Sequence, residues 1–494
     1  MNNRPVCLII RDGWGQGRED ETNAIYTADT PGTDRFMETC PSTIINTSGI
    51  HVGLPEGYQG NSEVGHLNIG AGRVVYQNLT RIDKAVEDGS FYSNRELLEA
   101  VDTAKKRGST LHLIGLIQEE GVHAVTRHCR SLLKLCKQQG FDNVVIHAIT
   151  DGRDTPPSSA PDHLKYLSEG IEKYGRGRIV TLIGRYFAMD RDKRWDRTEI
   201  AYRAIMKGEG KQVPDVDTGI KEAYDNGETD EFIKPRIIDY KGAGKDDVMI
   251  LFNFRFDRTR QLTKAIAEKD FNEFERVPHN IRFTAMTHYY DNGSFHEAFP
   301  EMENKNILGE MIAKKGLMQL RSAETEKFAH VTFFFNSLQN EPFKNEERIL
   351  VDSPREVATY DLKPEMSAFK VRDKLLEAIE SDRYDAIITN FANGDMVGHT
   401  GVHKAIEKAV ETVDTCVTEV VNSVLDKGGI CIVFADHGNA DQTKLDDGSP
   451  MTAHTVNPVP LFIAGAGDLR LREGGSLCDV APTMLELMGL EQPE

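Results

Sequence analysis

The hydrophobic positions of this chain fall in short continuous runs that end abruptly at polar residues. Six runs show the pattern most clearly, at residues 6–10, 143–150, 178–184, 248–254, 386–391 and 429–435. Continuous apolar runs of this length are typical of parallel strands buried on both faces of a sheet. An aspartate or arginine follows each run within four residues. Because ligands bind at the carboxyl ends of the strands in open α/β sheets, these endings predict a functional site there.

The segments between these runs have the hydrophobic spacing of amphipathic helices. The clearest are residues 95–106, 127–138, 368–379 and 404–425. Alternating strands and helices predict an α/β fold with mainly parallel sheets flanked by helices. A chain of 494 residues is too long for one core and predicts two to four domains. Residues 76–78 and the proline-containing segment 298–304 are the best breaks, so we interpret the piece between them as an inserted domain.

Composition narrows the class of protein. A hydrophobic content of 39% and a charged content of 28% are typical of a soluble globular protein, and no apolar run approaches the ~20 residues that span a bilayer. The N-terminus leads directly into a strand, so we expect no signal peptide. Seven scattered cysteines without CxxC spacing predict reduced thiols in a cytoplasmic protein. The net charge of −19 argues against nucleic-acid binding and requires local basic residues around any anionic substrate.

The stretch 57–73 is rich in glycine and contains one serine, Ser62. Glycines at this density let the backbone approach a ligand closely, and we expect Ser62 to be exposed. A serine hydroxyl is a weak nucleophile that needs a neighbouring base or metal ion. By itself the stretch is most simply an ordinary loop. The question is therefore which other residues activate Ser62.

Carboxylate and imidazole side chains accompany several of the expected strands: Asp12, Asp395, His399, Asp436, His437 and His454. The four-residue spacing of Asp395 and His399 places both on one face of a helix. Neutral imidazole with carboxylate is a ligand set for Zn²⁺ or Mn²⁺. Taken singly, each residue is more simply a helix cap or a core histidine, but together with Ser62 they favour two adjacent ions. Two such ions suit in-line phosphoryl transfer.

Five arginines follow expected strands in the inserted piece: Arg153, Arg185, Arg191, Arg255 and Arg258. Arginine is suited to bidentate binding of carboxylate and phosphate. Each of these sequence strings also contains an aspartate, so surface salt bridging explains them equally well from composition alone. His123 and Lys327 are single residues with weaker signals.

These motifs together resemble the cofactor-independent (2,3-bisphosphoglycerate-independent) phosphoglycerate mutases of the alkaline phosphatase superfamily. The matching strings extend over essentially the whole chain: Asp12-Gly-Trp-Gly, Gly60-Asn-Ser-Glu-Val-Gly-His-Leu-Asn-Ile-Gly-Ala-Gly-Arg, Thr150-Asp-Gly-Arg-Asp-Thr-Pro-Pro, Gly184-Arg-Tyr-Phe-Ala-Met-Asp-Arg, Asn253-Phe-Arg-Phe-Asp-Arg, Ala323-Glu-Thr-Glu-Lys, Phe391-Ala-Asn-Gly-Asp-Met-Val-Gly-His, Ala435-Asp-His-Gly-Asn and Thr452-Ala-His-Thr.

The resemblance implies an alkaline-phosphatase-like, metal-binding domain over residues 1–76 and 303–494. It implies an inserted, substrate-binding transferase domain over residues 77–302, joined to the first by two hinges, with catalysis between the domains. The metal is usually Mn²⁺, with Mg²⁺, Co²⁺ or Zn²⁺ as alternatives, and no 2,3-bisphosphoglycerate is needed. Members are typically monomers that act on 2- and 3-phosphoglycerate, without a nucleic-acid or membrane partner.

The resemblance also implies a role for each candidate residue. Ser62 would accept the phosphoryl group, and Asp154 would move a proton between the 2- and 3-hydroxyls of the glycerate. One metal ion would be held by Asp395, His399 and His454, and the other by Asp12, Ser62, Asp436 and His437. The glycerate would be held by His123, Arg153, Arg185 and Arg191, and the phosphate by Arg255, Arg258 and Lys327.

The chain departs from the family pattern at a few positions. The string Gln118-Glu-Glu-Gly-Val-His-Ala-Val stands where the family usually has Ser-x-Gly-Gly-Val-His-Ser-His. Gly394 replaces a common proline, and His288 replaces a glutamate or glutamine. Substrate preference is therefore the property most open to change in this chain.

We hypothesise an intramolecular phosphoryl shift between 3-phosphoglycerate and 2-phosphoglycerate through phosphorylated Ser62. A metal-dependent phosphatase or a phosphopentomutase-like relative is the rival enzyme, and the glycerate-binding arginines argue against it. A catalytically silent phosphometabolite-binding protein is the rival from another class. That alternative requires a missing ligand or nucleophile, and none is missing from the sequence.

Overall fold

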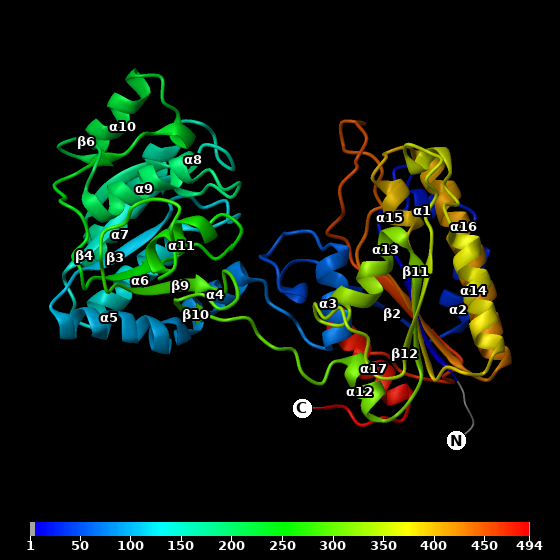
Figure 1. Ribbon diagram of the computed structural model, residues 1–494. Coiled ribbons are helices and arrows are strands. Elements are labelled where there is room, and N and C mark those ends of the chain that lie inside the picture. Colours follow the sequence, from blue (N-terminus) through cyan, green and yellow to red (C-terminus); the bar gives the residue numbers. More distant parts are fainter. Residues whose placement is uncertain (1–4, 494) are drawn as a thin grey trace. The chain divides into compact units, whose positions relative to one another are not determined.

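Two β-sheets, each in its own part of the chain, organise the structure. The computed structural model describes residues 5–493. The chain divides into two units, Met1–Gln77 with Glu303–Glu494 (unit 1) and Asn78–Met302 (unit 2). Each unit contains an eight-stranded, mainly parallel sheet with helices on both faces (Figure 1). The predicted α/β fold class is therefore confirmed.

The sheet of unit 1 has the strand order β12-β11-β13-β1-β14-β15-β2-β16. The first five strands are mutually parallel, and β15 runs antiparallel to both of its neighbours. Helices α14 and α16 cover one face, and α3, α12 and α17 cover the other (Figure 1). Apart from short 3₁₀ and π turns, the elements are β1 (Val6–Arg11), α1 (Ala24–Thr27), α2 (Pro31–Thr39), β2 (Ser42–Asn46), α3 (Ser62–Ala71), α12 (Leu308–Lys314), β11 (Gln319–Glu324), α13 (Thr325–Ala329), β12 (Glu346–Val351), α14 (Ala368–Glu380), β13 (Ala386–Phe391), α15 (Asn393–Gly398), α16 (His403–Asp426), β14 (Ile430–Phe434), β15 (Val459–Ala464), β16 (Gly475–Ser476) and α17 (Val480–Leu487).

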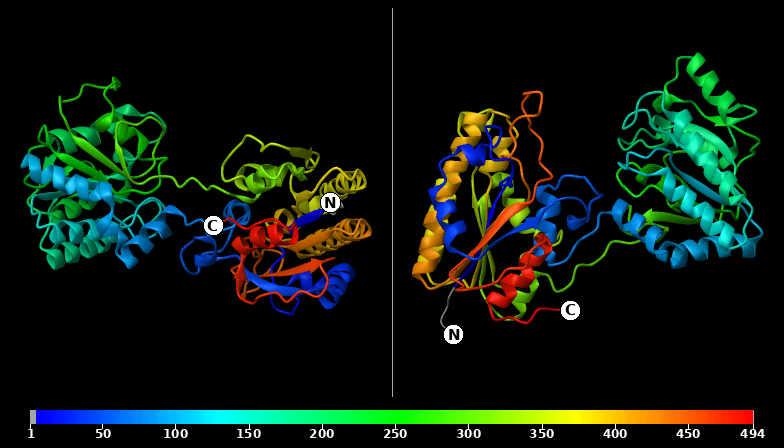
Figure 2. Two further views of the ribbon diagram at one scale, coloured as in Figure 1. Left: turned by 90° about the horizontal axis from the view of Figure 1, so that it is seen from below. Right: turned by 180° about the vertical axis from the view of Figure 1, so that it is seen from behind.

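The sheet of unit 2 has the strand order β10-β9-β8-β3-β4-β5-β7-β6, and only the β5–β7 pair is antiparallel. Helices α5, α6 and α7 lie on one face, and α9 and α11 on the other (Figure 2). Its elements are α4 (Asn78–Asp88), α5 (Arg95–Arg107), β3 (Leu111–Leu116), α6 (Thr126–Gln138), β4 (Val144–Thr150), α7 (Ala160–Tyr174), β5 (Ile179–Gly184), α8 (Arg185–Ala188), α9 (Trp195–Lys207), β6 (Lys211–Gln212), α10 (Val216–Asp225), β7 (Arg236–Ile237), β8 (Val248–Leu251), α11 (Arg260–Ala267), β9 (Arg282–Thr287) and β10 (His296–Phe299).

The six apolar runs form the central strands of the two sheets. All residues of β1, β4, β5, β8 and β13 are buried. The strand expected at 248–254 is shorter than predicted, because β8 ends at Leu251. Beyond that point the Asn253 side chain accepts a hydrogen bond from the Leu116 backbone at 2.9 Å. No described helix is long and apolar enough to cross a membrane, and the seven cysteines form no disulfide.

Candidate functional site

Ser62 is the first residue of a buried helix, not part of an exposed loop. The Asn61 side chain caps α3 by accepting a hydrogen bond from the Val64 backbone, and Ser62 is only 6% exposed. The expectations of an ordinary loop and an exposed serine are therefore wrong. The glycines serve close packing instead: a Cβ on Gly65 would lie 3.0 Å from Asp436, and one on Gly70 would lie 1.9 Å from a backbone oxygen. Only glycine lets the helix approach so closely.

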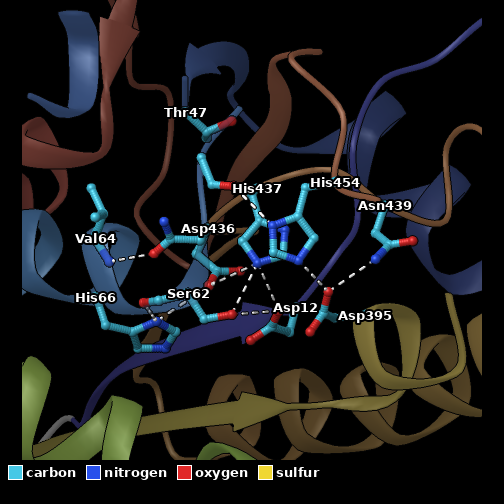
Figure 3. A network of polar contacts seen from close by, with 12 residues as sticks. Asp12, Thr47, Ser62, Val64, His66, Asp395, Asp436, His437, Asn439 and His454 are labelled. Carbon is cyan, nitrogen blue, oxygen red and sulfur yellow. Dashed lines mark hydrogen bonds and ion pairs between the residues drawn. The ribbon is translucent and has the colours of Figure 1, made fainter. Parts of the chain in front are cut away.

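The acidic strand endings of unit 1 lie at one edge of its sheet, facing Ser62. Asp12 follows β1, Asp395 lies in α15 directly after β13, and Asp436 follows β14. These three strands are neighbours and run parallel, so their carboxyl ends coincide. The Ser62 hydroxyl lies 3.3 Å from Asp12 Oδ1 and 2.9 Å from His437 Nε2 (Figure 3).

Two groups of side chains here have the composition and spacing of metal sites. Asp12, Asp436 and His437 form one group, and Asp395, His437 and His454 form the other, with ligand atoms within 4.8 Å of one another in each. His437 belongs to both, although the resemblance assigned it to the first alone. His399 lies at the side of the second group, with Nε2 3.2 Å from Asp395 Oδ1 and 3.2 Å from His454 Nε2.

Lys327 is the one ammonium in this cluster of described residues. Its Nζ donates to Ser62 Oγ and to Asp395 Oδ2, both at 2.6 Å, and lies 3.1 Å from Asp12 Oδ1. Burial lowers the pKa of Lys327, but the Asp12 and Asp395 carboxylates raise it more, so the net shift is upward. Lys327 is therefore protonated and positively charged beside the serine oxygen.

The charges of this cluster fit divalent cations. Three buried carboxylates, Asp12, Asp395 and Asp436, face the single ammonium of Lys327. Burial and the charge of Asp436 raise the pKa of Asp12, as expected for uncompensated negative charge. Both carboxylate oxygens of Asp436 are buried and accept no hydrogen bond in the described structure, although Oδ2 lies 3.2 Å from His66 Nδ1. Buried carboxylates without donors are costly unless a cation supplies the missing contact.

Several residues that the sequence did not single out hold the candidate ligands in place. Asn390 Nδ2 donates to Asp12 Oδ2 at 2.8 Å, and Asn439 Nδ2 donates to Asp395 Oδ1 at 3.0 Å. His66 lies one helical turn after Ser62, and its Nδ1 is 2.9 Å from the Ser62 carbonyl oxygen and 3.2 Å from Asp436 Oδ2. The i,i+4 spacing of His66 from Ser62 was the available signal, because it places both on one helix face.

The arginine strand endings lie together in unit 2. Asp151, Arg153 and Asp154 follow β4, and Arg185 follows β5. Arg255 and Arg258 follow β8, and His123 lies beyond β3. Strands β8, β3, β4 and β5 are consecutive and parallel, so these residues share one edge of the sheet. A cavity of about 310 Å³ is lined by Arg153, Arg185 and Arg258, together with Arg194 and Arg197.

Four of the five arginines predicted from the sequence contact carboxylates, and the contacts of Arg185 are buried. Arg185 is 2% exposed, and its Nη1 lies 2.7 Å from Asp151 Oδ1 and also donates to Asp154. Arg153 Nε lies 3.5 Å from Glu231. Arg258 Nη1 donates instead to a backbone oxygen, that of Met189 at 3.1 Å. Surface salt bridging therefore does not explain Arg185, whereas the half-exposed pairs of Arg153, Arg191 and Arg255 still fit it.

His123 is buried between two acidic side chains. Its Nε2 lies 3.7 Å from Asp154 Oδ2, and its Nδ1 lies 3.6 Å from Asp257 Oδ1. Burial and the charge of Arg185 lower the pKa of His123 to about 4, so the ring is neutral at pH 7. The divergent loop before it is closed by Gln118, whose Nε2 donates to the Ala124 carbonyl oxygen at 2.8 Å. The altered sequence around His123 therefore still forms an ordered turn.

The comparisons with known proteins agree along the whole chain. The model of the Metalloenzyme superfamily matches residues 4–492. A 2,3-bisphosphoglycerate-independent phosphoglycerate mutase of Clostridium botulinum is 48% identical over 500 residues, covering 100% of this chain and 98% of that protein. The 2,3-bisphosphoglycerate-independent phosphoglycerate mutase 1 of Methanosarcina acetivorans is 49% identical, and the match covers 99% of this chain and 97% of that protein. The crystal structure of Leishmania mexicana phosphoglycerate mutase at low cobalt concentration aligns with a TM-score of 0.57 at 33% identity, covering 99% and 96%.

Proposed function

Because the chain belongs to the 2,3-bisphosphoglycerate-independent phosphoglycerate mutases of the Metalloenzyme superfamily, we propose that it interconverts 3-phosphoglycerate and 2-phosphoglycerate. One observation carries the proposal for this chain. The Ser62 oxygen lies within hydrogen-bond distance of both Lys327 and His437, in a cluster with surplus negative charge. That arrangement supports phosphoryl transfer through the serine.

Ser62 is the proposed nucleophile. Its Oγ forms a bond to phosphorus while the bond between phosphorus and the substrate oxygen breaks, which leaves phosphoserine and glycerate. The second glycerate oxygen then attacks the phosphoserine, and Ser62 is released. The ammonium of Lys327, 2.6 Å from Oγ, stabilises negative charge on the serine oxygen and on the phosphoryl oxygens near it.

The metal-ligand candidates divide between two divalent cations. Asp12, Ser62, Asp436 and His437 would hold one cation, and Asp395, His399 and His454 the other. Bound cations would keep the serine oxygen in its alkoxide form and withdraw charge from the phosphoryl oxygens. The buried Asp436 carboxylate, which accepts no hydrogen bond, and the crystal structure of the Leishmania mutase at low cobalt concentration support divalent metal binding. We expect Mn²⁺ to be preferred, with Mg²⁺, Co²⁺ and Zn²⁺ as alternatives.

Unit 2 has the groups needed to hold a small acid that carries a carboxylate and a phosphate group, and to move its protons. Arg153, Arg185 and Arg191 would bind the glycerate carboxylate with His123, and Arg255 and Arg258 would bind phosphate. Asp154 gives a proton to the departing glycerate oxygen and takes one from the hydroxyl that attacks next. The contact between Arg185 and Asp154 supports this role, because it holds the Asp154 carboxyl group among the arginines proposed to bind the substrate.

In this proposal unit 1 is the phosphatase-like, metal-binding domain and unit 2 is the transferase domain. The protein acts as a monomer in the cytoplasm and needs no 2,3-bisphosphoglycerate. Water must be kept from the phosphoserine, since hydrolysis would turn the mutase into a phosphatase.

An enolase-coupled assay tests the function directly. The purified protein is stripped with EDTA, and 2-phosphoglycerate formation from 3-phosphoglycerate is measured with and without added Mn²⁺. We expect metal-dependent turnover without 2,3-bisphosphoglycerate. Release of inorganic phosphate in place of 2-phosphoglycerate would identify a phosphatase and overturn the proposal.

A further inference from the structure

Asp257 links three of the proposed substrate-binding side chains. Its Oδ2 lies 2.8 Å from Arg191 Nη1, and its Oδ1 lies 3.1 Å from Arg255 Nε. The same Oδ1 lies 3.6 Å from His123 Nδ1. These three partners follow three different strands, β5, β8 and β3. One carboxylate therefore joins groups that the sequence places more than 60 residues apart.

The surroundings of Asp257 are strongly basic, so its negative charge reduces the repulsion between the neighbouring arginines. Burial and the charges of Arg185, Arg191 and Arg153 lower the pKa of Arg258, so the arginines repel one another. Other carboxylates face the remaining members: Asp151 and Asp154 contact Arg185, and Glu231 contacts Arg153. Asp257 lies within 4 Å of both Arg191 and Arg255.

The protein around Asp257 holds its side chain in place. Its side chain is 19% exposed, whereas those of Arg191 and Arg255 are 48% and 49% exposed. The backbone of the adjacent loop is tied to the His123 loop, because the Phe254 amide donates to the His123 carbonyl oxygen at 2.9 Å. A long, half-exposed arginine loses much rotamer freedom on binding a ligand, and a fixed carboxylate removes part of that cost beforehand.

We propose that Asp257 is a positioning residue of the glycerate site. It orients Arg191 and Arg255 toward an incoming anion, and its Oδ1 lies 3.6 Å from His123 Nδ1 without a hydrogen bond between them. The substrate's own anionic group then shares the arginines that Asp257 has already aligned. This inference rests on the proposed function, and it deepens it by naming the group that orders the binding side chains.

A charge-removing variant tests the inference. D257N keeps the size of the side chain and one acceptor oxygen but removes the negative charge. We expect its Kd for 3-phosphoglycerate, measured by calorimetry, to rise at least about 10-fold, because misplaced binding groups are costly. We expect KM to rise similarly while kcat changes less. D257E keeps the charge and should recover part of the loss.

The matched control is D142N. Asp142 also pairs with an arginine of unit 2, Arg176, at 2.8 Å, and lies outside the proposed site. Its Kd should equal that of the wild type. A D257N Kd within about 2-fold of the D142N value would overturn the inference. If D257N fails to fold, D257S, which also removes the negative charge, takes its place in the same comparison: a Kd at least about 10-fold above that of D142N supports the role, and a Kd within about 2-fold overturns it.

Binding also separates this inference from the proposed function. The calorimetric Kd ratio does not require turnover. A wild-type protein that binds 3-phosphoglycerate but lacks mutase activity would overturn the proposed function. The effect of D257N on the Kd could still be measured in that case. An active wild type with a normal Kd in D257N would defeat only the positioning role.

Discussion

The ammonium nitrogen of Lys327 lies 2.6 Å from the hydroxyl oxygen of Ser62. The two residues are 265 positions apart in the chain, and both are buried. Lys327 is held there by the carboxylates of Asp12 and Asp395, which keep it charged. A fixed positive charge beside a serine oxygen is suited to stabilising an anionic nucleophile.

Replacing Lys327 by methionine should therefore lower kcat strongly. We expect a loss of about 10²- to 10³-fold, similar to the removal of one preorganised donor from an active site. The enolase-coupled assay measures it. Lys305→Met is the control, because Lys305 forms an exposed pair with Glu303 in the same unit. A Lys327→Met enzyme with kcat close to that of the control would contradict the role.

Ser62→Ala should abolish mutase activity, with kcat reduced by at least about 10³-fold, because no other hydroxyl in the cluster replaces the nucleophile. Mass spectrometry after a rapid acid quench should find a phosphorylated peptide containing Ser62 in the wild type and not in the variant. Full activity of Ser62→Ala would show that the phosphoryl group does not pass through this serine.

Metal removal should both inactivate and destabilise the protein. Cations that bind the native state raise Tm with metal concentration, since the unfolded chain lacks the assembled carboxylates. We expect EDTA to lower Tm, Mn²⁺ to restore it, and elemental analysis to find two ions per chain. Asp436→Asn should bind one ion fewer. A Tm that does not respond to EDTA or Mn²⁺ would argue against both sites.

His66 should influence metal binding without contacting the substrate. Its ring lies 3.2 Å from Asp436 and 2.9 Å from the Ser62 carbonyl oxygen, so it orients both the ligand and the helix start. His66→Leu should weaken Mn²⁺ binding by about 10- to 100-fold, the usual effect of losing a group that supports a metal ligand. Titration of the stripped protein with Mn²⁺ measures it, and saturating Mn²⁺ should recover much of the activity.

Unit 2 should lose stability in mild acid because of a buried histidine chain. His147 Nε2 lies 2.9 Å from His112 Nδ1, and His112 Nε2 lies 2.9 Å from Asp247 Oδ2. Burial and the neighbouring His112 lower the pKa of His147 well below its ordinary value of about 6.5. The unfolded chain therefore binds a proton that the folded unit does not, and stability falls as pH drops below about 6.5.

The expected contribution is about 1.4 kcal/mol per pH unit, from the free energy of binding one proton. His147→Leu should be less stable at pH 7, because Thr181 and His112 lose a partner, but its stability should change less between pH 6.5 and 5. Urea unfolding at several pH values measures both effects.

His288 should have the opposite effect on the pH dependence of stability. Neighbouring carboxylates raise the His288 pKa, so the stabilisation by His288 is present in acid and is lost as pH rises through that pKa. His288→Gln should remove this contribution.

Local sequence was sufficient for the elements themselves. The helices expected at 95–106, 127–138, 368–379 and 404–425 agree with α5, α6, α14 and α16 to within one residue at each end. Apolar runs such as 386–391 form buried parallel strands because such a run has no polar face to leave in water. The charged residues that follow the strands were also evident from the sequence, and they predicted a functional site because ligands bind at the carboxyl ends of strands in open α/β sheets.

Only the tertiary structure decided how those endings are grouped and what surrounds them. The aspartates after β1, β13 and β14 meet in one sheet, and the arginines after β5 and β8 meet in the other, because strand order is set by long-range pairing. Ser62 is buried because Gly65 and Gly70 let α3 pack closely, whereas composition alone suggested that this stretch was a loop. Asp257 looked like an ordinary neighbour of Arg255 and Arg258. Its contacts with Arg191 and His123 depend on which strands lie side by side. A hydrophobic pattern is local and does not determine strand order.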